Sequence, residues 1–180
     1  MKLLCLFDGE AKRFEAARGT TEVASGALLN HAALEEVVLP EGVRVIGAAA
    51  CKGCRALRRV VIPEGVAEMG AEALMDTALE SIDIPASLEK IGENAVVTYN
   101  AHNGKRQPTL REITVAQGNA RYEEKNGMLL EKWSNGHARV VVNTDSRECV
   151  RIPEEVVAIA PYAFNGDRNI RELYLSDRIK

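Results

Sequence analysis

The sharpest chemical motif in this sequence is the pair of cysteines in Cys51-Lys-Gly-Cys54. A Cys-x-x-Cys pair can be a redox dithiol or half of a zinc site. Zinc needs two more ligands, and the sequence has no second cysteine pair and no well-spaced histidine pair. A redox dithiol needs its first cysteine at a helix N-terminus after a strand, and that context is missing here. We therefore expect both thiols to be buried, reduced and free of metal.

The three histidines, His31, His102 and His137, suggest no catalytic arrangement. None of them aligns with a nucleophile or a pair of carboxylates, as catalysis would require. Calcium-binding β-rolls need glycine-rich nonapeptides with recurring aspartate, and the sequence has none. We therefore expect a protein that is not an enzyme, with no catalytic residue, no cofactor and no metal site.

Composition and charge exclude several classes of partner. The 180 residues include 23 basic and 26 acidic side chains, so the net charge of −3 gives no electrostatic footprint for nucleic acid. No apolar run reaches the 18 residues that a membrane-spanning helix needs, which predicts no membrane insertion. No signal peptide is recognisable at the N-terminus. The four cysteines form no disulfide framework, and free thiols favour a reducing compartment.

Six segments of the sequence repeat one pattern, in which apolar residues alternate over a short strand. The strands begin near residues 34, 57, 79, 110, 147 and 170, and three of the five intervals are 22 or 23 residues. One such coil cannot bury its apolar face alone, so neighbouring coils must stack and share a core. We expect the six strands to form one parallel sheet in sequence order. The residues expected in its buried column are Val37, Val60, Ile82, Ile113, Val150 and Leu173.

A second apolar pair follows each strand, and a small residue then precedes a larger one. Val43 and Ile46 form such a pair, and Ala50-Cys51 follows them. Together these features give the pattern Leu-x-x-Ile-x-Ile-Pro-x-x-Val-x-x-Ile-(Gly)-x-x-Ala-Phe-x-x-Cys-x-x-Leu. Residues 150–170 are its closest copy. The pattern resembles that of BspA-like leucine-rich-repeat proteins and covers nearly all of residues 20–180.

The resemblance implies a leucine-rich-repeat solenoid that is mainly β, with about six coils of about 23 residues. We expect the convex side to be short helical or irregular, with two β-hairpin insertions. This sequence departs from the family pattern at several positions: Arg147 replaces the expected leucine, Ala160 the glycine and Cys51 the phenylalanine, and Thr77 opens a shorter coil. The resemblance also implies cell-surface, adhesion-like and protein-binding roles for many members, and no catalytic residues.

The insertions define the expected organisation of one domain over residues 1–180. A hairpin is expected at 1–19, coils at 20–115, a hairpin insertion at 116–146 around Ser134-Asn-Gly136, and coils at 147–180. The polar stretch 97–108 is expected to be a surface loop. The absence of capping helices favours a fragment of a longer repeat array.

The leading functional prediction is a non-enzymatic protein-interaction module that presents a rigid repeat surface. The alternatives are a structural spacer or adhesion-type domain of a larger surface protein and, third, a thiol-dependent enzyme. End-to-end self-association is also expected, whereas localisation stays open because the free thiols favour the cytoplasm and the resemblance favours the cell surface. The candidate partner-binding residues are Tyr99, His102, Lys105, Arg106 and Trp133.

The outward face of the predicted sheet carries charges of strictly alternating sign. The residue after each strand's first position is Glu35, Arg58, Glu80, Arg111, Glu148 and Arg171 in turn. In a parallel, in-register sheet these residues would be cross-strand neighbours. Because a slipped coil would bring like charges together, we expect this column to stabilise the register.

Overall fold

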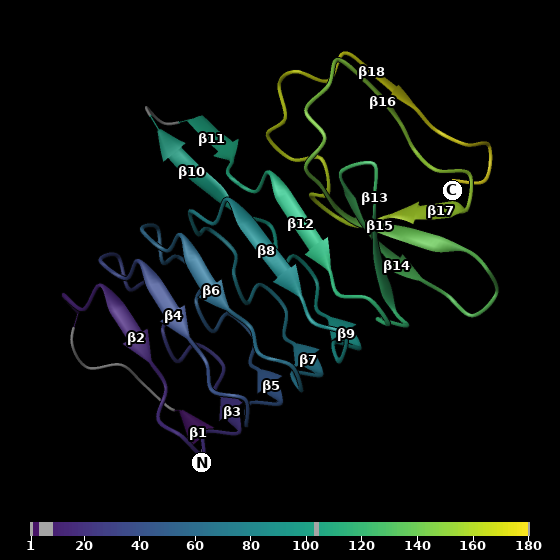
Figure 1. Ribbon diagram of the computed structural model, residues 1–180. Coiled ribbons are helices and arrows are strands. Elements are labelled where there is room, and N and C mark those ends of the chain that lie inside the picture. Colours follow the sequence, from purple (N-terminus) through teal and green to yellow (C-terminus); the bar gives the residue numbers. More distant parts are fainter. Residues whose placement is uncertain (1, 4–8, 103–104, 180) are drawn as a thin grey trace.

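The computed structural model describes residues 2–3, 9–102 and 105–179, and it is a solenoid of stacked coils (Figure 1). No helix occurs within these ranges, so none is present there that is long and apolar enough to cross a membrane. The fold is therefore the mainly β solenoid that the repeat predicts. The short helical convex side that was allowed as one alternative is wrong for the described residues.

The longer strands form one face of the N-terminal coils. Strands β2 (Arg13–Glu15), β4 (Glu36–Val38) and β6 (Arg59–Val61) are parallel and in register. Strand β8 (Ser81–Ile84) lies beside β6 and pairs in parallel with β12 (Glu112–Val115) (Figure 1). The five strands follow one another in sequence order, and four of them, β4, β6, β8 and β12, are among the six strands predicted from the repeat.

A second parallel sheet of two-residue strands forms the other face of these coils. It contains β1 (Lys2–Leu3), β3 (Glu22–Val23), β5 (Val45–Ile46), β7 (Glu68–Met69) and β9 (Lys90–Ile91), in that order. The apolar pair of each coil has a spacing of three because its first member closes a turn and its second lies in the strand. In one coil, the N–H of Val43 donates to the carbonyl of Pro40 at 3.0 Å.

The N-terminal segment forms a coil, and the hairpin predicted over residues 1–19 is wrong for its described part. Leu3 pairs in parallel with Val23, and Phe14 pairs in parallel with Val37. Both strands therefore continue the two sheets of the solenoid, in register with the strands of the next coil. Residues 4–8, which include part of the expected turn, lie outside the described residues.

The insertion after β12 forms an antiparallel ribbon of three strands. These are β13 (Tyr122–Lys125), β14 (Met128–Lys132) and β15 (Ala138–Asn143), and the predicted hairpin joins the last two. Strand β17 (Val156–Ile159) of the next coil pairs in parallel with β15. The ribbon thus takes the place that a preceding coil would occupy under β17.

The ribbon separates two hydrophobic cores, and each of its faces packs into a different one. Leu129, Val141 and Val142 belong to the core of the N-terminal coils. Met128, Leu130, Ala138 and Val140 belong to the core of the C-terminal coils. Side chains of successive strand residues point to opposite faces, which explains how one ribbon serves both cores. Val141 is the extra residue of a β-bulge and therefore shares the side of Val142.

The prediction of one continuous sheet is wrong, because β8 and β12 pair separately from β2, β4 and β6, and the ribbon interrupts the array after β12. Strand β16 (Cys149–Arg151) pairs with β18 (Glu172–Tyr174) in a separate two-stranded sheet, not with β12. Most of the predicted column is buried, namely Val37, Ile82, Ile113 and Val150. Val60 is half-buried, and Leu173 on β18 is 39% exposed because no described strand covers its outer side.

A glycine follows each of β5, β7 and β9 because consecutive coils touch there. A Cβ atom added to Gly47, Gly70 or Gly92 would lie 2.4, 2.4 or 2.3 Å from a backbone nitrogen of the preceding coil. In the C-terminal coil the same position is Ala160, whose N–H donates to the carbonyl of Val140 on β15 at 2.8 Å. Ala160 therefore packs on the ribbon, where the glycine requirement does not hold.

Candidate interaction surface

The alternating charges lie in one column along the N-terminal coils, as the sequence predicts. The N–H of Arg58 donates to the carbonyl of Glu35 at 2.9 Å, and the N–H of Arg111 donates to the carbonyl of Glu80 at 2.8 Å. The column is interrupted after Arg111, because the ribbon separates β12 from the C-terminal coils. It resumes in those coils, where Arg171 pairs with Glu148.

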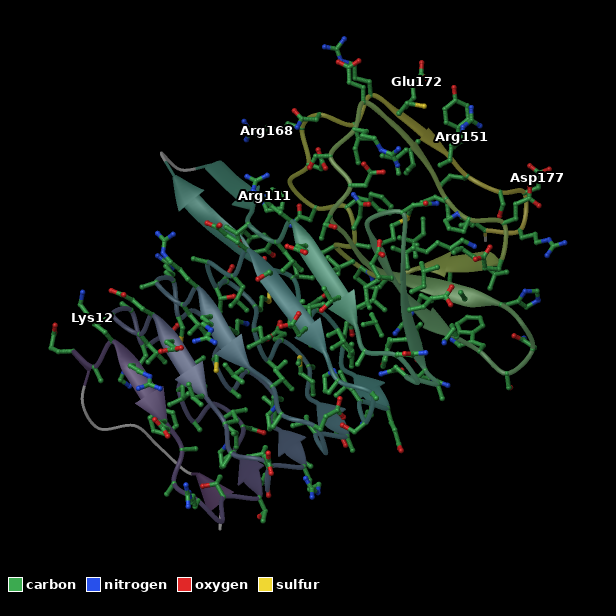
Figure 2. All side chains as sticks on the ribbon, in the orientation of Figure 1. Lys12, Arg111, Arg151, Arg168, Glu172 and Asp177 are labelled. Atoms are coloured by element: carbon green, nitrogen blue, oxygen red, sulfur yellow. The ribbon has the colours of Figure 1, made fainter. Side chains whose placement is uncertain are left out.

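The side chains of this column form ion pairs two by two. Lys12 pairs with Glu35 at 3.0 Å, and Arg58 pairs with Glu80 at 3.7 Å. These side chains are half or more exposed, so each pair contributes only about 0–1 kcal/mol. Counted from Lys12, Arg111 is the fifth residue of the column, and its guanidinium has no carboxylate partner among the described residues. Figure 2 shows Lys12 and Arg111 at the two ends of this column.

A neighbouring column, which the sequence analysis missed, is neutralised in the same way. The carboxylate of Glu36 accepts from Arg13 at 2.8 Å and from Arg59 at 2.5 Å. Two residues further along the strands, Thr114 donates a hydrogen bond to Asp83 across β8 and β12. Most charges on the outward face of the N-terminal coils therefore bind one another, and the exposed guanidinium of Arg111 is an exception.

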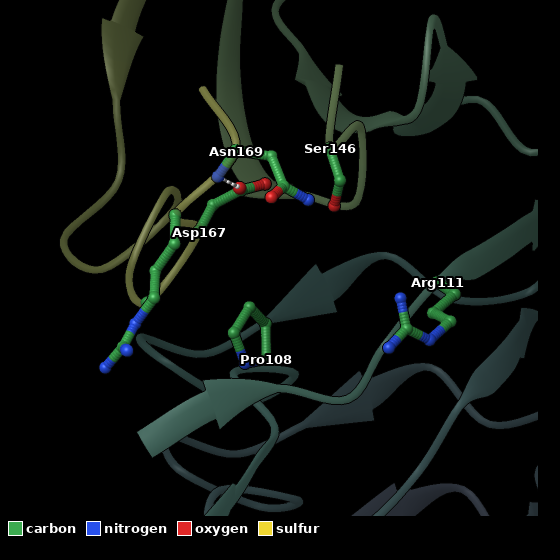
Figure 3. A pocket seen from close by; sticks show the side chains of 7 residues that line it. Pro108, Arg111, Ser146, Asp167 and Asn169 are labelled. Atoms are coloured by element: carbon green, nitrogen blue, oxygen red, sulfur yellow. Dashed lines mark hydrogen bonds between the residues drawn. The ribbon is translucent and has the colours of Figure 1, made fainter. Parts of the chain in front are cut away.

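A cleft of about 230 Å³ lies beside Arg111, at the break between the two sets of coils (Figure 3). Arg111 approaches it from β12, and Ser146 and Asn169 approach it from the C-terminal coils. The backbone N–H of Asn169 donates to the carboxylate of Asp167 at 2.9 Å, which fixes the turn on that side. The residues that line the cleft are Pro108, Arg111, Ser146, Gly166, Asp167, Arg168 and Asn169.

The stretch 97–108, predicted to be a loop, contains a β-hairpin that projects from the sheet (Figure 1). Its strands are β10 (Tyr99–His102) and β11 (Lys105–Pro108), in antiparallel pairing. Thr98 anchors the base of the hairpin, because its hydroxyl accepts from the hydroxyl of Thr109 at 2.9 Å. The last residue of β11, Pro108, lines the cleft, so the hairpin and the cleft form one continuous surface.

The predicted binding residues of this hairpin divide into two groups. Tyr99 is only 4% exposed, so it packs at the base and offers little surface to a partner. His102, Lys105 and Arg106 lie on the projecting strands, and their side chains are outside the described residues. Their backbone places them on the same hairpin, as the sequence predicts.

Trp133 lies far from this surface, at the turn between β14 and β15 (Figure 1). Its N–H donates to the carbonyl of His137 at 2.8 Å, and its side chain is half-buried. The structure therefore does not bring Trp133 together with the hairpin β10–β11. Sequence reasoning missed Arg111 as a separate site, although the long interval between the fourth and fifth strands signals that the column is interrupted there.

The two cysteines of the Cys-x-x-Cys motif are core residues, which confirms their predicted burial. Cys51 is 3% exposed and Cys54 is fully buried, and both thiols are free. Burial, together with the neighbouring Cys54, raises the pKa of the Cys51 thiol. Burial also raises the pKa of Cys54 to about 11, although a hydrogen bond from the backbone of His31 opposes the shift. Both thiols are therefore protonated at neutral pH and are poor nucleophiles.

The other candidates for chemistry are dispersed over the described residues. His31 is half-buried in an N-terminal coil, His137 is half-buried at the turn between β14 and β15, and Cys149 is exposed on β16. Within the described ranges, no group of three or more His, Cys, Asp or Glu side chains is arranged to hold a metal ion. The arrangement offers a surface for contacts, and the cleft beside Arg111 is a concave feature lined mainly by polar and charged side chains.

The repeat pattern identifies the family. Residues 12–116, more than half of the chain, match the BspA type leucine rich repeat region in six copies. The chain belongs to this family of leucine-rich-repeat proteins. Among curated proteins, no sequence matches significantly.

Solved structures of bacterial leucine-rich-repeat proteins share the fold. A leucine rich cell surface protein from Faecalibacterium prausnitzii is 25% identical, with a TM-score of 0.73 over 89% of this chain and 46% of its own. The pneumococcal vaccine antigen PcpA is 19% identical, with a TM-score of 0.77 over 94% of this chain and 44% of its own. A leucine-rich repeat protein from Eubacterium ventriosum is 16% identical, with a TM-score of 0.68 over 93% of this chain and 48% of its own. The chain spans less than half the length of each of them.

Proposed function

We propose that this protein is a non-enzymatic protein-interaction module whose binding surface consists of the hairpin β10–β11, the outward face of β12 and the cleft beside Arg111. The observation that carries the proposal is the position of the hairpin. It is inserted directly before β12, and its last residue, Pro108, lines the same cleft as Arg111. An irregular insertion next to an unneutralised charge supplies features that a partner can recognise, whereas the regular coils supply few.

The rigidity of the coils supports a binding role. Backbone hydrogen bonds link neighbouring N-terminal coils, as at Arg58 to Glu35 on one face and at Gly70 to Ile46 on the other. A surface held by such a scaffold loses little conformational entropy when a partner binds. The family membership and the similarity to a leucine rich cell surface protein support the same class of function.

A panel of purified proteins, including proteins exposed on cell surfaces, tests the proposal by biolayer interferometry. The informative variant replaces residues 100–107 with a short Gly-Ser turn. We expect at least one specific partner, whose affinity falls about tenfold or more, about 1.4 kcal/mol, in this variant while thermal stability is kept. Specific binding that is unchanged in the variant would exclude the hairpin from the surface, and a panel without any partner would contradict the proposal.

The alternative of a structural spacer is favoured by one observation: the ribbon packs on both hydrophobic cores and so connects the two sets of coils. A spacer needs stiffness and a neutral surface but no partner. It predicts that the wild-type chain and the hairpin variant bind nothing specifically and have the same stability. The same biolayer measurements therefore distinguish the two functions.

End-to-end self-association stays a prediction, and its site is the outer edge of β18. No described strand pairs with this edge, and Leu173, Tyr174 and Leu175 are 39%, 42% and 53% exposed there. An apolar strand with an unpaired edge can add a strand from a second chain. Sedimentation velocity over a concentration series measures the association, which Leu173→Lys should abolish.

A further inference from the structure

We propose that the cleft beside Arg111 binds a carboxylate group from an acidic segment of a protein partner. The inference rests on the proposed interaction function and specifies the chemistry of the partner. Its basis is the charge column, in which Arg111 is left without a carboxylate where the other basic residues have one.

The number of residues in the column determines which charge is left over. Signs alternate along five consecutive coils, so two ion pairs form and one residue remains. Glu80 is already engaged with Arg58, and Glu148, the next acidic residue of the column, pairs with Arg171. A sixth coil stacked directly on β12 would supply the missing carboxylate, but the ribbon prevents such stacking. The guanidinium of Arg111 is therefore exposed, and the space beside it lacks the glutamate that accompanies each other basic residue of the column.

Neutral hydrogen-bond donors face the same space. The hydroxyl of Ser146 and the side-chain amide of Asn169 border the cleft opposite Arg111 (Figure 3). Neither group has a hydrogen-bond partner among the described residues. A carboxylate can accept from all of these donors, and charge-assisted bonds to arginine are the strongest of them.

The balance of charge around the cleft favours an anion. Arg111 and Arg168 are basic, and Asp167 is the one acidic residue of the lining. The backbone N–H of Asn169 donates to the Asp167 carboxylate at 2.9 Å, which partly neutralises its field. The lining therefore carries a net positive charge, although the whole chain carries −3.

The size of the cleft distinguishes a side chain from a small-molecule ligand. Its volume of about 230 Å³ is below the roughly 300–1,000 Å³ of pockets that enclose small molecules. It can take one or two side chains of a partner that lies across the surface. The hairpin β10–β11 borders the cleft through Pro108 and would contact the same partner.

Fluorescence anisotropy with a fluorescein-labelled hexaglutamate peptide at low salt tests the proposal. The variant is Arg111→Gln and its matched control is Arg13→Gln, which removes the same charge from the same face but from a position that is paired with Glu36 and far from the cleft. We expect Arg111→Gln to weaken binding about tenfold and Arg13→Gln to leave it unchanged. Asn169→Ala, which keeps the charge, should weaken binding about threefold through the lost hydrogen bond.

Each of four outcomes would overturn the proposal. In the first, the wild-type protein fails to bind hexaglutamate or binds labelled hexaglutamine equally well. In the second, the two arginine variants weaken binding equally, which would indicate diffuse attraction by the whole surface. In the third, a sulfated polysaccharide binds through Arg111 and hexaglutamate does not. A protein partner that binds the Arg111→Gln variant normally would refute the carboxylate site and leave the proposed interaction function standing.

Discussion

Gly70 and Ala160 occupy the same position of the repeat in two coils that rest on different supports. Beneath Gly70 lies another coil, so close that a Cβ atom would meet a backbone nitrogen at 2.4 Å. Beneath Ala160 lies β15 of the ribbon. The comparison teaches that the repeat glycine is required by the contact between two coils and not by the conformation of the coil that contains it.

The two sets of coils also differ in whether every charge of the column is paired, and the ribbon is again the cause. In the N-terminal coils, neighbouring charges of the column pair across adjacent coils, and the C-terminal coils form a complete pair of their own. The ribbon between them leaves Arg111 unpaired. An insertion thus changes the repeat on both sides of it, and the exposed arginine and the tolerated alanine have one structural cause.

The largest effect on stability is expected from truncating a buried leucine of the ribbon. Leu129 and Leu130 are adjacent on β14 and both fully buried, but they belong to different cores. Replacing either with alanine should lower the free energy of unfolding by about 3 kcal/mol, through lost burial and the resulting cavity. Each variant serves as the control of the other, because the substitution is identical.

Hydrogen exchange followed by mass spectrometry separates the two variants. Leu129→Ala should reduce amide protection mainly in residues 12–116, and Leu130→Ala mainly in residues 147–179. If both variants lost protection equally in both ranges, the two cores would unfold as one cooperative unit. The contrast between the two sets of coils would then not extend to their stability.

A smaller effect is expected at the glycine position itself. Gly70→Ala should destabilise the protein by about 2 kcal/mol, because the added methyl group forces the backbones of two coils apart. The reciprocal variant Ala160→Gly should cost less than about 1 kcal/mol, from the greater freedom of the unfolded chain. Urea unfolding measures both. If the two variants lost equal free energy of unfolding, the contact with the underlying coil or ribbon would not determine whether glycine or alanine is required.

The smallest effect is expected from the charge column. Arg58→Glu removes the pair with Glu80 and places a third acidic residue between two others, so it should cost about 0.5 kcal/mol at low salt. The loss should shrink as salt is added, because these exposed charges are screened. Arg55→Glu makes the same charge change on an exposed side chain outside the column. Thermal unfolding over a salt series measures both variants. If Arg55→Glu lost as much stability as Arg58→Glu, the charge column would not stabilise the coils.

The sequence was sufficient to predict the features that recur in every coil. Burial of Val37, Ile82 and Ile113 follows from the alternation of apolar residues, and burial of Cys51 follows from its position in the repeat. The second sheet could not be predicted in this way, because its two-residue strands are too short to show a period. Their apolar spacing of three resembles a helix as much as a strand.

The features that depend on neighbours were predicted less well than those within a coil. The apolar run Met128-Leu129-Leu130 indicates that both faces of its strand are buried, but it does not identify two separate cores. Leu173 has the residue type of the buried column, yet it is exposed because no described strand covers it. The same limit applies to the candidate surface: the repeat predicts where Arg111 lies, but only the position of the ribbon shows that it lacks a partner.

The alternation of sign gives the solenoid two periods of different length. The backbone repeats after one coil, whereas the charge pattern repeats only after two. Gaining or losing a single coil within the paired array would bring two like charges together, whereas gaining or losing two adjacent coils would keep every neighbour opposite. Electrostatics therefore favours growth of this array by duplication of coil pairs, and an unpaired charge marks a place where an odd number of coils meets an interruption.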